Sequence, residues 1–168
     1  MVVSPGPAQA QAFSGGPTVA RAQERQLGVA LTRHQRSAMT VLTSWGAASV
    51  GAGAALMASA PDDDFLFWGG VQHLSWGLVN ILIGASSLHS ARPAVLDEPH
   101  APDHWRRRQQ RMPRGFWINA ALDVLYVASG ALMWGLLKPE GGRGSGAAIV
   151  GQGGFLLGFD IIAALTVP

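Results

Sequence analysis

The chain has 168 residues, of which 48% are hydrophobic and only 13% are charged. Soluble domains average about 25% charged residues, so this balance indicates a membrane protein. Cysteine is absent, which excludes disulfides, thiolate metal sites and cysteine nucleophiles. The 11 Arg and single Lys cluster beside apolar stretches, a distribution typical of membrane topology and not of a nucleic-acid-binding surface.

The first part of the chain is expected to lie outside the bilayer. Residues 1–18 are rich in Pro, Gly, Ala and Gln, a composition that predicts disorder. Between 19 and 37, apolar positions recur near a helical period among four Arg residues. This pattern predicts a basic juxtamembrane helix lying at the lipid headgroups. It could bind anionic lipid or a partner, but a solvated topological anchor is the preferred interpretation.

Four apolar spans follow, at 38–60, 65–87, 116–137 and 146–167. With ~1.5 Å of rise per residue, each would extend about 33 Å, enough to cross a bilayer core of ~30 Å. The predicted fold is therefore all-α: a polytopic membrane protein with four transmembrane helices in an antiparallel bundle, forming a domain over residues 38–167. The long connection at 88–115 is predicted to be a cytoplasmic loop.

The basic residues predict the orientation of these spans. Four precede the first span, none lies in the first connection, six lie in the 88–115 loop, two lie in the third connection, and none follows the last span. The positive-inside rule then places the N-terminal tail, the long loop and the C-terminus in the cytoplasm.

Polar side chains inside the spans fall at two depths. One level lies seven residues from the cytoplasmic end of each span, about 10 Å deep by helical rise. It comprises Trp45, Asn80, Asp123 and Asp160. On the third span Asn119, Asp123 and Tyr126 are spaced i, i+4, i+7 and share one face. A second level nearer the outside comprises Gln72, His73 and Gln152.

The two halves of the chain echo one another. Gln72-x7-Asn80-Ile81 in the second span matches Gln152-x7-Asp160-Ile161 in the fourth. Two hairpins of the same orientation would be related by an axis along the membrane normal, as in tandem hairpin repeats. Gly151, Gly154 and Gly158 in the fourth span are expected to pack against a neighbouring helix.

The paired aspartates allow two interpretations. No Lys or Arg lies inside a span to neutralise Asp123 or Asp160. Two carboxylates at one depth of a low-dielectric bundle cannot both be ionised cheaply. They either share a proton, as in a proton-coupled transporter, or act as neutral polar groups that hydrogen-bond across the bundle and specify its register. The structural interpretation is preferred.

No cofactor and no metal site is predicted. His73 is the only histidine well inside a span, whereas a haem held by two imidazoles needs a second one at the same depth. His100, Asp103 and His104 bring nitrogen and oxygen ligands close together, but the neighbouring prolines favour a solvated loop. The Arg residues of the same loop could dock anionic lipid, and inside-positive charge explains them equally well.

With these residues in view, the chain resembles a family of bacterial membrane proteins of unknown function. The resemblance rests on Asn119-Ala120-Ala121-Leu122-Asp123-Val124 with Tyr126, on the stretch Gly146–Leu157 ending at Asp160, and more weakly on Trp76 with Asn80 and on Met39–Trp45. It covers roughly residues 25–165. It implies four membrane spans in the bacterial inner membrane and no known activity, substrate or cofactor.

The preferred function is therefore a non-enzymatic structural or assembly subunit of the membrane, acting with another membrane protein or as a homo-oligomer. The alternative is a small proton- or ion-coupled transporter or channel that uses the two aspartates. A membrane enzyme is the least favoured class, because the spans lack paired ligands. A hydrated cavity at Asp123 and Asp160 would favour the transporter; a dry, fully paired layer would favour the structural role.

Overall fold

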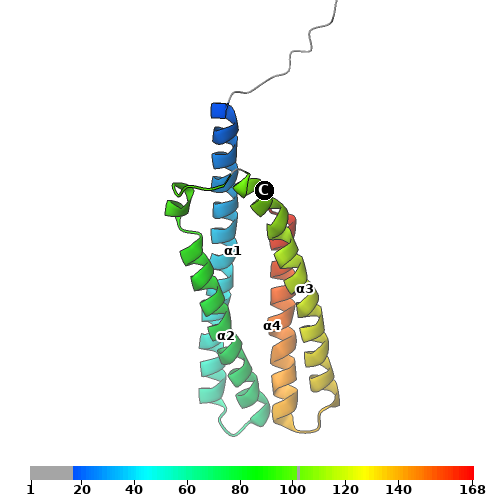
Figure 1. Ribbon diagram of the computed structural model, residues 1–168. Helices are drawn as coiled ribbons and strands as arrows, with labels where there is room; N and C mark the ends of the chain where they lie inside the picture. The colour runs from blue at the N-terminus through cyan, green and yellow to red at the C-terminus, as the bar shows by residue number, and fades with distance from the viewer. Residues whose placement is uncertain (1–16, 102) are drawn as a thin grey trace, which may run out of the picture.

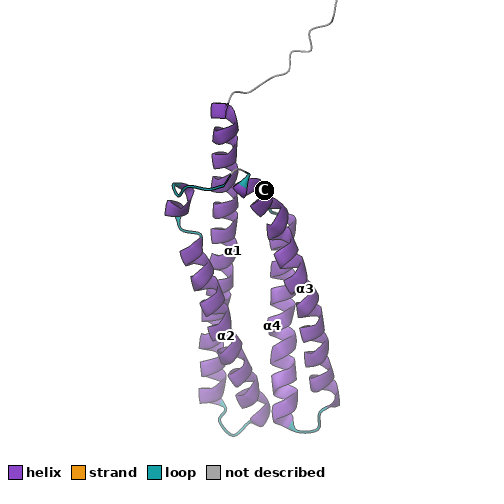
Figure 2. Ribbon diagram, in the orientation of Figure 1, coloured by secondary structure: helices purple, strands orange, loops and turns teal. Residues whose placement is uncertain are grey.

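The computed structural model describes residues 17–101 and 103–168, and in these ranges every regular element is a helix (Figure 2). Four long helices follow one another: α1 (Pro17–Ser59), α2 (Asp64–Ser90), α3 (His104–Leu136) and α4 (Glu140–Leu165). A short 3-10 helix, η1 (Pro93–Leu96), lies between α2 and α3. The all-helical class expected from the sequence is confirmed.

Three of the long helices, α1, α3 and α4, are long and apolar enough to cross a membrane. The 27 residues of α2 would also be long enough. Its apolar sequence, however, is interrupted by Gln72, His73 and Asn80, which lower its mean hydropathy. The hydropathy of these helices therefore indicates a membrane protein.

Residues 19–37 are helical, as expected, but they do not form an element of their own, because α1 is one helix of 43 residues. At ~1.5 Å per residue it is about 64 Å long, and its N-terminal part extends past the other helices (Figure 1). Residues 29–45 contain neither Gly nor Pro, so nothing in the sequence ends the helix there. Pro17 and Thr18, assigned to the disordered tail, already belong to α1; the rest of that tail lies outside the described residues.

The loop predicted at 88–115 is shorter in the structure than expected. α2 continues to Ser90 and α3 begins at His104, so only residues 91–103 lie outside the long helices. The Arg and Gln residues that open α3 are good helix formers, and Pro113 lies within the helix. α4 begins at Glu140 instead of 146, with Pro139 as its extended N-cap residue.

Glycines bring the helices of each hairpin almost into backbone contact. In the α1–α2 hairpin, a Cβ added at Gly46 would lie 2.7 Å from the carbonyl oxygen of Gly77. In the α3–α4 hairpin, a Cβ at Gly146 would lie 2.7 Å from the carbonyl oxygen of Gly130. Close approach at small residues is the usual way in which helices associate in lipid.

The two hairpins touch at one end and separate toward the other. The turns between α1 and α2 and between α3 and α4 lie at the same end, and there α2 packs on α4 (Figure 1). Gly144 faces the backbone of Phe65 at this contact. Farther along, large side chains hold the hairpins apart: the rings of Trp45 and Phe155 stack with centroids 4.0 Å apart.

At the opposite end, the connection between α2 and α3 ties α1 to α3. Trp105 is buried against Gly28, and its backbone N–H donates to Glu24 at 3.3 Å. Arg106 forms an ion pair with Glu24 at 3.3 Å, and Arg25 forms one with Asp97 at 3.3 Å. The C-terminus lies at this same end (Figure 1).

Candidate functional site

Two groups of polar side chains lie between the hairpins, where the helices have separated. The first, the glutamine cluster, consists of Trp45, Ser49, His73 and Gln152. The second, the carboxyl cluster, consists of Asn80, Asn119, Asp123, Tyr126 and Asp160. The two clusters differ in how completely their polar atoms are paired.

Gln152 is the centre of the glutamine cluster and is completely buried, with 0% of its surface exposed. Its side-chain oxygen accepts a hydrogen bond from the Trp45 indole N–H at 2.7 Å. Its side-chain nitrogen donates to the hydroxyl of Ser49 at 2.9 Å and contacts Nδ1 of His73 at 2.8 Å. These bonds join α1, α2 and α4.

The donor-only indole of Trp45 sets the hydrogen-bond directions in this cluster. Because an indole N–H can only donate, the Gln152 atom that faces it must be the amide oxygen. The amide nitrogen therefore faces Ser49 and His73, and Nδ1 of His73 must accept. The proton of the His73 ring is then on Nε2. Every buried polar side-chain atom of this cluster therefore has a partner, and its bonds join the two hairpins.

The carboxyl cluster surrounds a cavity of about 370 Å³ between the hairpins. Asn80, Asp123 and Asp160 are buried, with 2%, 9% and 5% of their surfaces exposed. Trp76 completes one wall, its ring 4.9 Å from that of Tyr126. Water takes up roughly 30 Å³ per molecule in the liquid, so the cavity has room for several polar guests.

The two carboxyl groups face each other within this cavity. Asp123 and Asp160 are neighbours on the lining of this cavity, and Asn119 lies beside Asp160. A carboxylate can only accept, so a hydrogen bond between two carboxyl groups requires a proton on one of them. Of the described residues that line the cavity, none is Lys, Arg or His.

Several polar atoms of the carboxyl cluster lack partners. Among the described residues, no hydrogen-bond partner is found for the Asn80 amide nitrogen, Oδ2 of Asp123 or the Tyr126 hydroxyl, all of which are buried. An unpaired buried polar group costs roughly 1–3 kcal/mol, so such atoms ordinarily meet water or a ligand. The cavity therefore offers donors and acceptors to a small polar guest.

Most of the polar residues expected from the sequence contribute to one cluster or the other, with two differences. Trp45, assigned to the aspartate level, instead bonds Gln152 in the glutamine cluster. Gln72, assigned to the level of Gln152, is only half-buried and has no hydrogen bond to another described side chain. Counting residues from the end of a span gives depth alone, whereas these contacts also depend on how each helix is rotated.

The packing role expected for Gly151, Gly154 and Gly158 is wrong within this chain. A Cβ added at any of them would meet nothing within 4 Å. Other glycines of α4 do pack: a Cβ added at Gly144, Gly146 or Gly153 would collide with a neighbouring helix. A Gly-x3-Gly spacing identifies a smooth helix face but does not say which neighbour covers it.

In the described part of the connection between α2 and α3, the His and Asp side chains do not form a metal site. The rings of His100 and His104 stack at 4.3 Å, and Nε2 of His100 donates to the carbonyl of Val95 at 2.7 Å. Within residues 17–101 and 103–168, no three His, Asp or Glu side chains gather closely enough to hold a metal ion.

The sequence of this chain matches one known protein family. The model described as a family of unknown function (DUF6992) matches residues 41–161. The chain belongs to this family. No curated protein and no solved structure matches it. The DUF6992 match begins before Trp45 and ends just after Asp160, so it contains both polar clusters and leaves out the first part of α1.

Three features of the site were missed from the sequence. Ser49 pairs with Gln152, and the signal for it is its spacing of four residues from Trp45 on α1. Trp76 packs against Tyr126 with ring centroids 4.9 Å apart, a contact that the sequence did not predict. The third feature is a cavity at the Arg-rich end of α3, which no sequence period reveals.

Proposed function

We propose that this member of DUF6992 is a multi-pass protein of the bacterial inner membrane in which all four long helices, α2 included, cross the bilayer as an antiparallel bundle. The outward-facing side chains of α2 support this assignment: Leu78, Val79, Leu82 and Ile83 are exposed and apolar. Asn80, which lowers the hydropathy of α2, is buried. The mean hydropathy of the whole of α2 therefore understates how apolar its outer face is.

The proposed role is proton binding at the carboxyl cluster, as part of a small proton- or ion-coupled carrier and not an enzyme. The observation that carries this proposal is that two buried carboxyl groups, those of Asp123 and Asp160, line one cavity, with no basic residue among its described lining residues. A proton or a cation is then the natural counter-charge for the pair.

The contrast with the glutamine cluster supports this choice over a purely structural role. A polar layer that only fixes helix register should have its buried atoms paired, as those around Gln152 are. The carboxyl cluster instead borders a cavity and leaves buried atoms without protein partners. The preference drawn from the sequence, for a structural layer throughout, is therefore reversed for this cluster alone.

Proton uptake into liposomes tests the proposal. The purified protein, reconstituted with a pH-sensitive dye inside, should acidify the lumen when a potassium gradient with valinomycin makes the interior negative. Asp160→Asn and Asp123→Asn keep the size and hydrogen-bonding capacity of the neutral acid but cannot release a proton. They should fold normally and abolish uptake.

Asp62→Asn is the matched control, because Asp62 lies exposed in the α1–α2 turn. It should leave proton uptake unchanged. Wild-type protein that is folded in the liposomes yet carries no protons, or Asn variants as active as the parent, would overturn the proposed function.

A second candidate, an assembly subunit, is supported by the open glycine face of α4. Gly154 and Gly158 line an apolar groove of about 510 Å³ between α1 and α4, with Val41 and Phe159 among its walls. A second copy of the chain, or a helix of another membrane protein, would fit such a groove. Gly154→Leu should then dissociate the assembly in light-scattering measurements while the monomer stays folded.

A further inference from the structure

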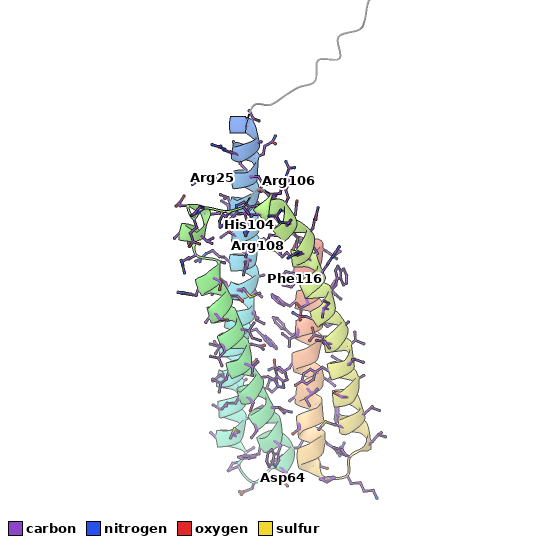
Figure 3. The ribbon with its side chains drawn as sticks, in the orientation of Figure 1. Arg25, Asp64, His104, Arg106, Arg108 and Phe116 are labelled. Atoms are coloured by element: carbon purple, nitrogen blue, oxygen red, sulfur yellow. The ribbon has the colours of Figure 1, made fainter. Side chains whose placement is uncertain are left out.

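A second cavity, the mouth cavity, lies at the end of the bundle away from the short turns. It has a volume of about 540 Å³ and lies among α1, α2 and the first four turns of α3. Its lining residues are Gln35, Met39, Ser87, His104, Arg107, Arg108, Arg111, Met112, Gly115, Phe116 and Asn119. In Figure 3, His104, Arg108 and Phe116 lie at the end opposite Asp64.

The mouth cavity adjoins the cavity of the carboxyl cluster. Met39, Phe116 and Asn119 line both. Asp160 lines the second cavity together with Asn119, so the Asn119 side chain belongs both to the mouth cavity and to the carboxyl cluster. Residues of α1, α2 and α3 line both cavities, and the backbones of α2 and α3 do not pack closely.

The side chains that line the mouth cavity are rich in positive charge. Arg107, Arg108 and Arg111 line it together with His104, and none of the described lining residues is acidic. Arg107 and Arg111 are separated by four residues and share a helical face. Such a group of guanidinium groups is suited to a phosphate, whose oxygens accept several N–H bonds at once.

One of these guanidinium groups is held in place by the protein. Arg108 donates to the side-chain oxygen of Gln35 on α1, and its guanidinium carbon lies 5.5 Å from the centre of the Trp105 ring. Trp105 itself is 5% exposed. Arg108 is therefore ordered before any ligand arrives, which reduces the entropy lost on binding.

The remaining wall of the mouth cavity is apolar. Met39, Met112 and Phe116 lie between the Arg residues and the carboxyl cluster, and Ile83 and Leu122 continue the apolar surface beyond them. A ligand that satisfies the whole lining must carry an anionic group at one end and an apolar chain at the other.

We propose that the mouth cavity binds the phosphate group of an anionic phospholipid, with an acyl chain lying against Met39, Met112 and Phe116. A lipid is favoured over a free phosphorylated solute because the apolar wall leads along the α2–α3 gap, away from the charged end. A zwitterionic lipid fits less well, since its ammonium group would approach the same Arg residues. The proposal goes beyond the carrier function and does not depend on it.

Native mass spectrometry of the full chain, purified from micelles holding equal amounts of phosphatidylglycerol and phosphatidylcholine, tests this proposal. The wild-type protein should retain phosphatidylglycerol in preference to phosphatidylcholine. Arg111→Gln should lower phosphatidylglycerol retention roughly fivefold, the effect of one basic side chain near an anionic lipid surface. Arg111→Lys, which keeps the charge, should retain most of it.

Arg114→Gln is the matched control. Arg114 lies three residues after Arg111 on α3 and carries the same charge, but its side chain does not line the cavity. Arg114→Gln should change retention by less than about twofold. Equal losses from both Gln variants would mean diffuse attraction and would overturn the site. So would equal retention of the two lipids by the wild-type protein.

Inorganic phosphate and glycerol 3-phosphate distinguish the two sources of a phosphate group. Neither, at millimolar concentration and constant ionic strength, should displace the retained lipid. Displacement by either would assign the site to a free phosphate and contradict the lipid. Asp160→Asn should keep lipid retention while losing proton uptake, so the failure of one proposal is separable from the failure of the other.

Discussion

Gln152 is the residue whose polar contacts the bundle most depends on. Replacing it with Leu would leave the Trp45 indole, the Ser49 hydroxyl and the His73 ring without their shared partner. Each unpaired buried group costs roughly 1–3 kcal/mol, so Gln152→Leu should lower the free energy of unfolding by at least that amount. Reversible unfolding in mixed detergent micelles measures the change.

Gln72→Leu provides the control for this substitution. Gln72 is the same residue type in the neighbouring helix, is half-buried, and bonds no other described side chain. Its replacement should change the stability by less than about 0.5 kcal/mol, as is usual away from buried polar contacts. If the two variants lost equal stability, the hydrogen bonds of Gln152 would not be what joins the hairpins.

At the scale of single residues, the sequence predicts which polar side chains lie at one depth better than it predicts which side chains they bond to. Asn80, Asp123 and Asp160 could be assigned to one level because polar residues are rare in apolar spans and depth follows from helical rise. The partner of Trp45 could not be assigned. It depends on the rotation of α1 about its own axis, which the packing of Gly46 and Gly53 on α2 decides.

Among the helices, α1 differs most from its expected form, and its length is directly measurable. The chain has no cysteine, so Ala22→Cys and Ala52→Cys can be spin-labelled without background. In one continuous helix, 30 residues of separation give about 45 Å between backbone positions. A right-angle bend near residue 37, with an N-terminal helix at the headgroups, would give about 32 Å. Pulsed electron resonance in nanodiscs distinguishes these distances, and a dominant short distance would contradict the continuous helix.

The glycines of α4 provide a second test at the scale of helices. A Cβ at Gly144 would collide with the backbone carbonyl of Phe65, which cannot move without shifting α2. Gly144→Ala should therefore lower the melting temperature in detergent by several degrees, the effect of ~1–3 kcal/mol of overpacking. Gly151→Ala should leave it unchanged or raise it, because its Cβ meets nothing and Ala favours the helix by up to ~1 kcal/mol.

The helices themselves were predictable from the sequence, but several of their ends were not. Apolar runs indicate where lipid would surround a helix, and they end where Arg or Gly residues begin. Helical structure continues past those points, through Arg106–Arg108 in α3 and through Gly141 and Gly142 in α4. Hydropathy therefore gives the length of the membrane crossing and not the length of the helix.

The whole molecule consists of two hairpins that share one close contact and then diverge. Glycines at the turn end set the contact, large aromatic and polar side chains fill the middle, and a basic mouth lies at the other end. A sequence reports which residues are small or large but not where two helices cross. The cavity that the divergence creates, which supports the proposed function, therefore required the structure.

The orientation of this molecule in the membrane decides whether the basic mouth faces the cytoplasm, and single cysteines can test it. Asp62→Cys lies in the α1–α2 turn, Lys138→Cys in the α3–α4 turn and Ala94→Cys in the connection between α2 and α3, all at exposed positions. With four spans and an inside-positive arrangement, a membrane-impermeant maleimide should label the first two in intact spheroplasts. It should label Ala94→Cys only after lysis. Labelling of Asp62→Cys and Ala94→Cys from the same side would show that α2 does not cross the bilayer. The reverse pattern, with only Ala94→Cys labelled in intact spheroplasts, would place the mouth cavity and its Arg residues at the outer surface.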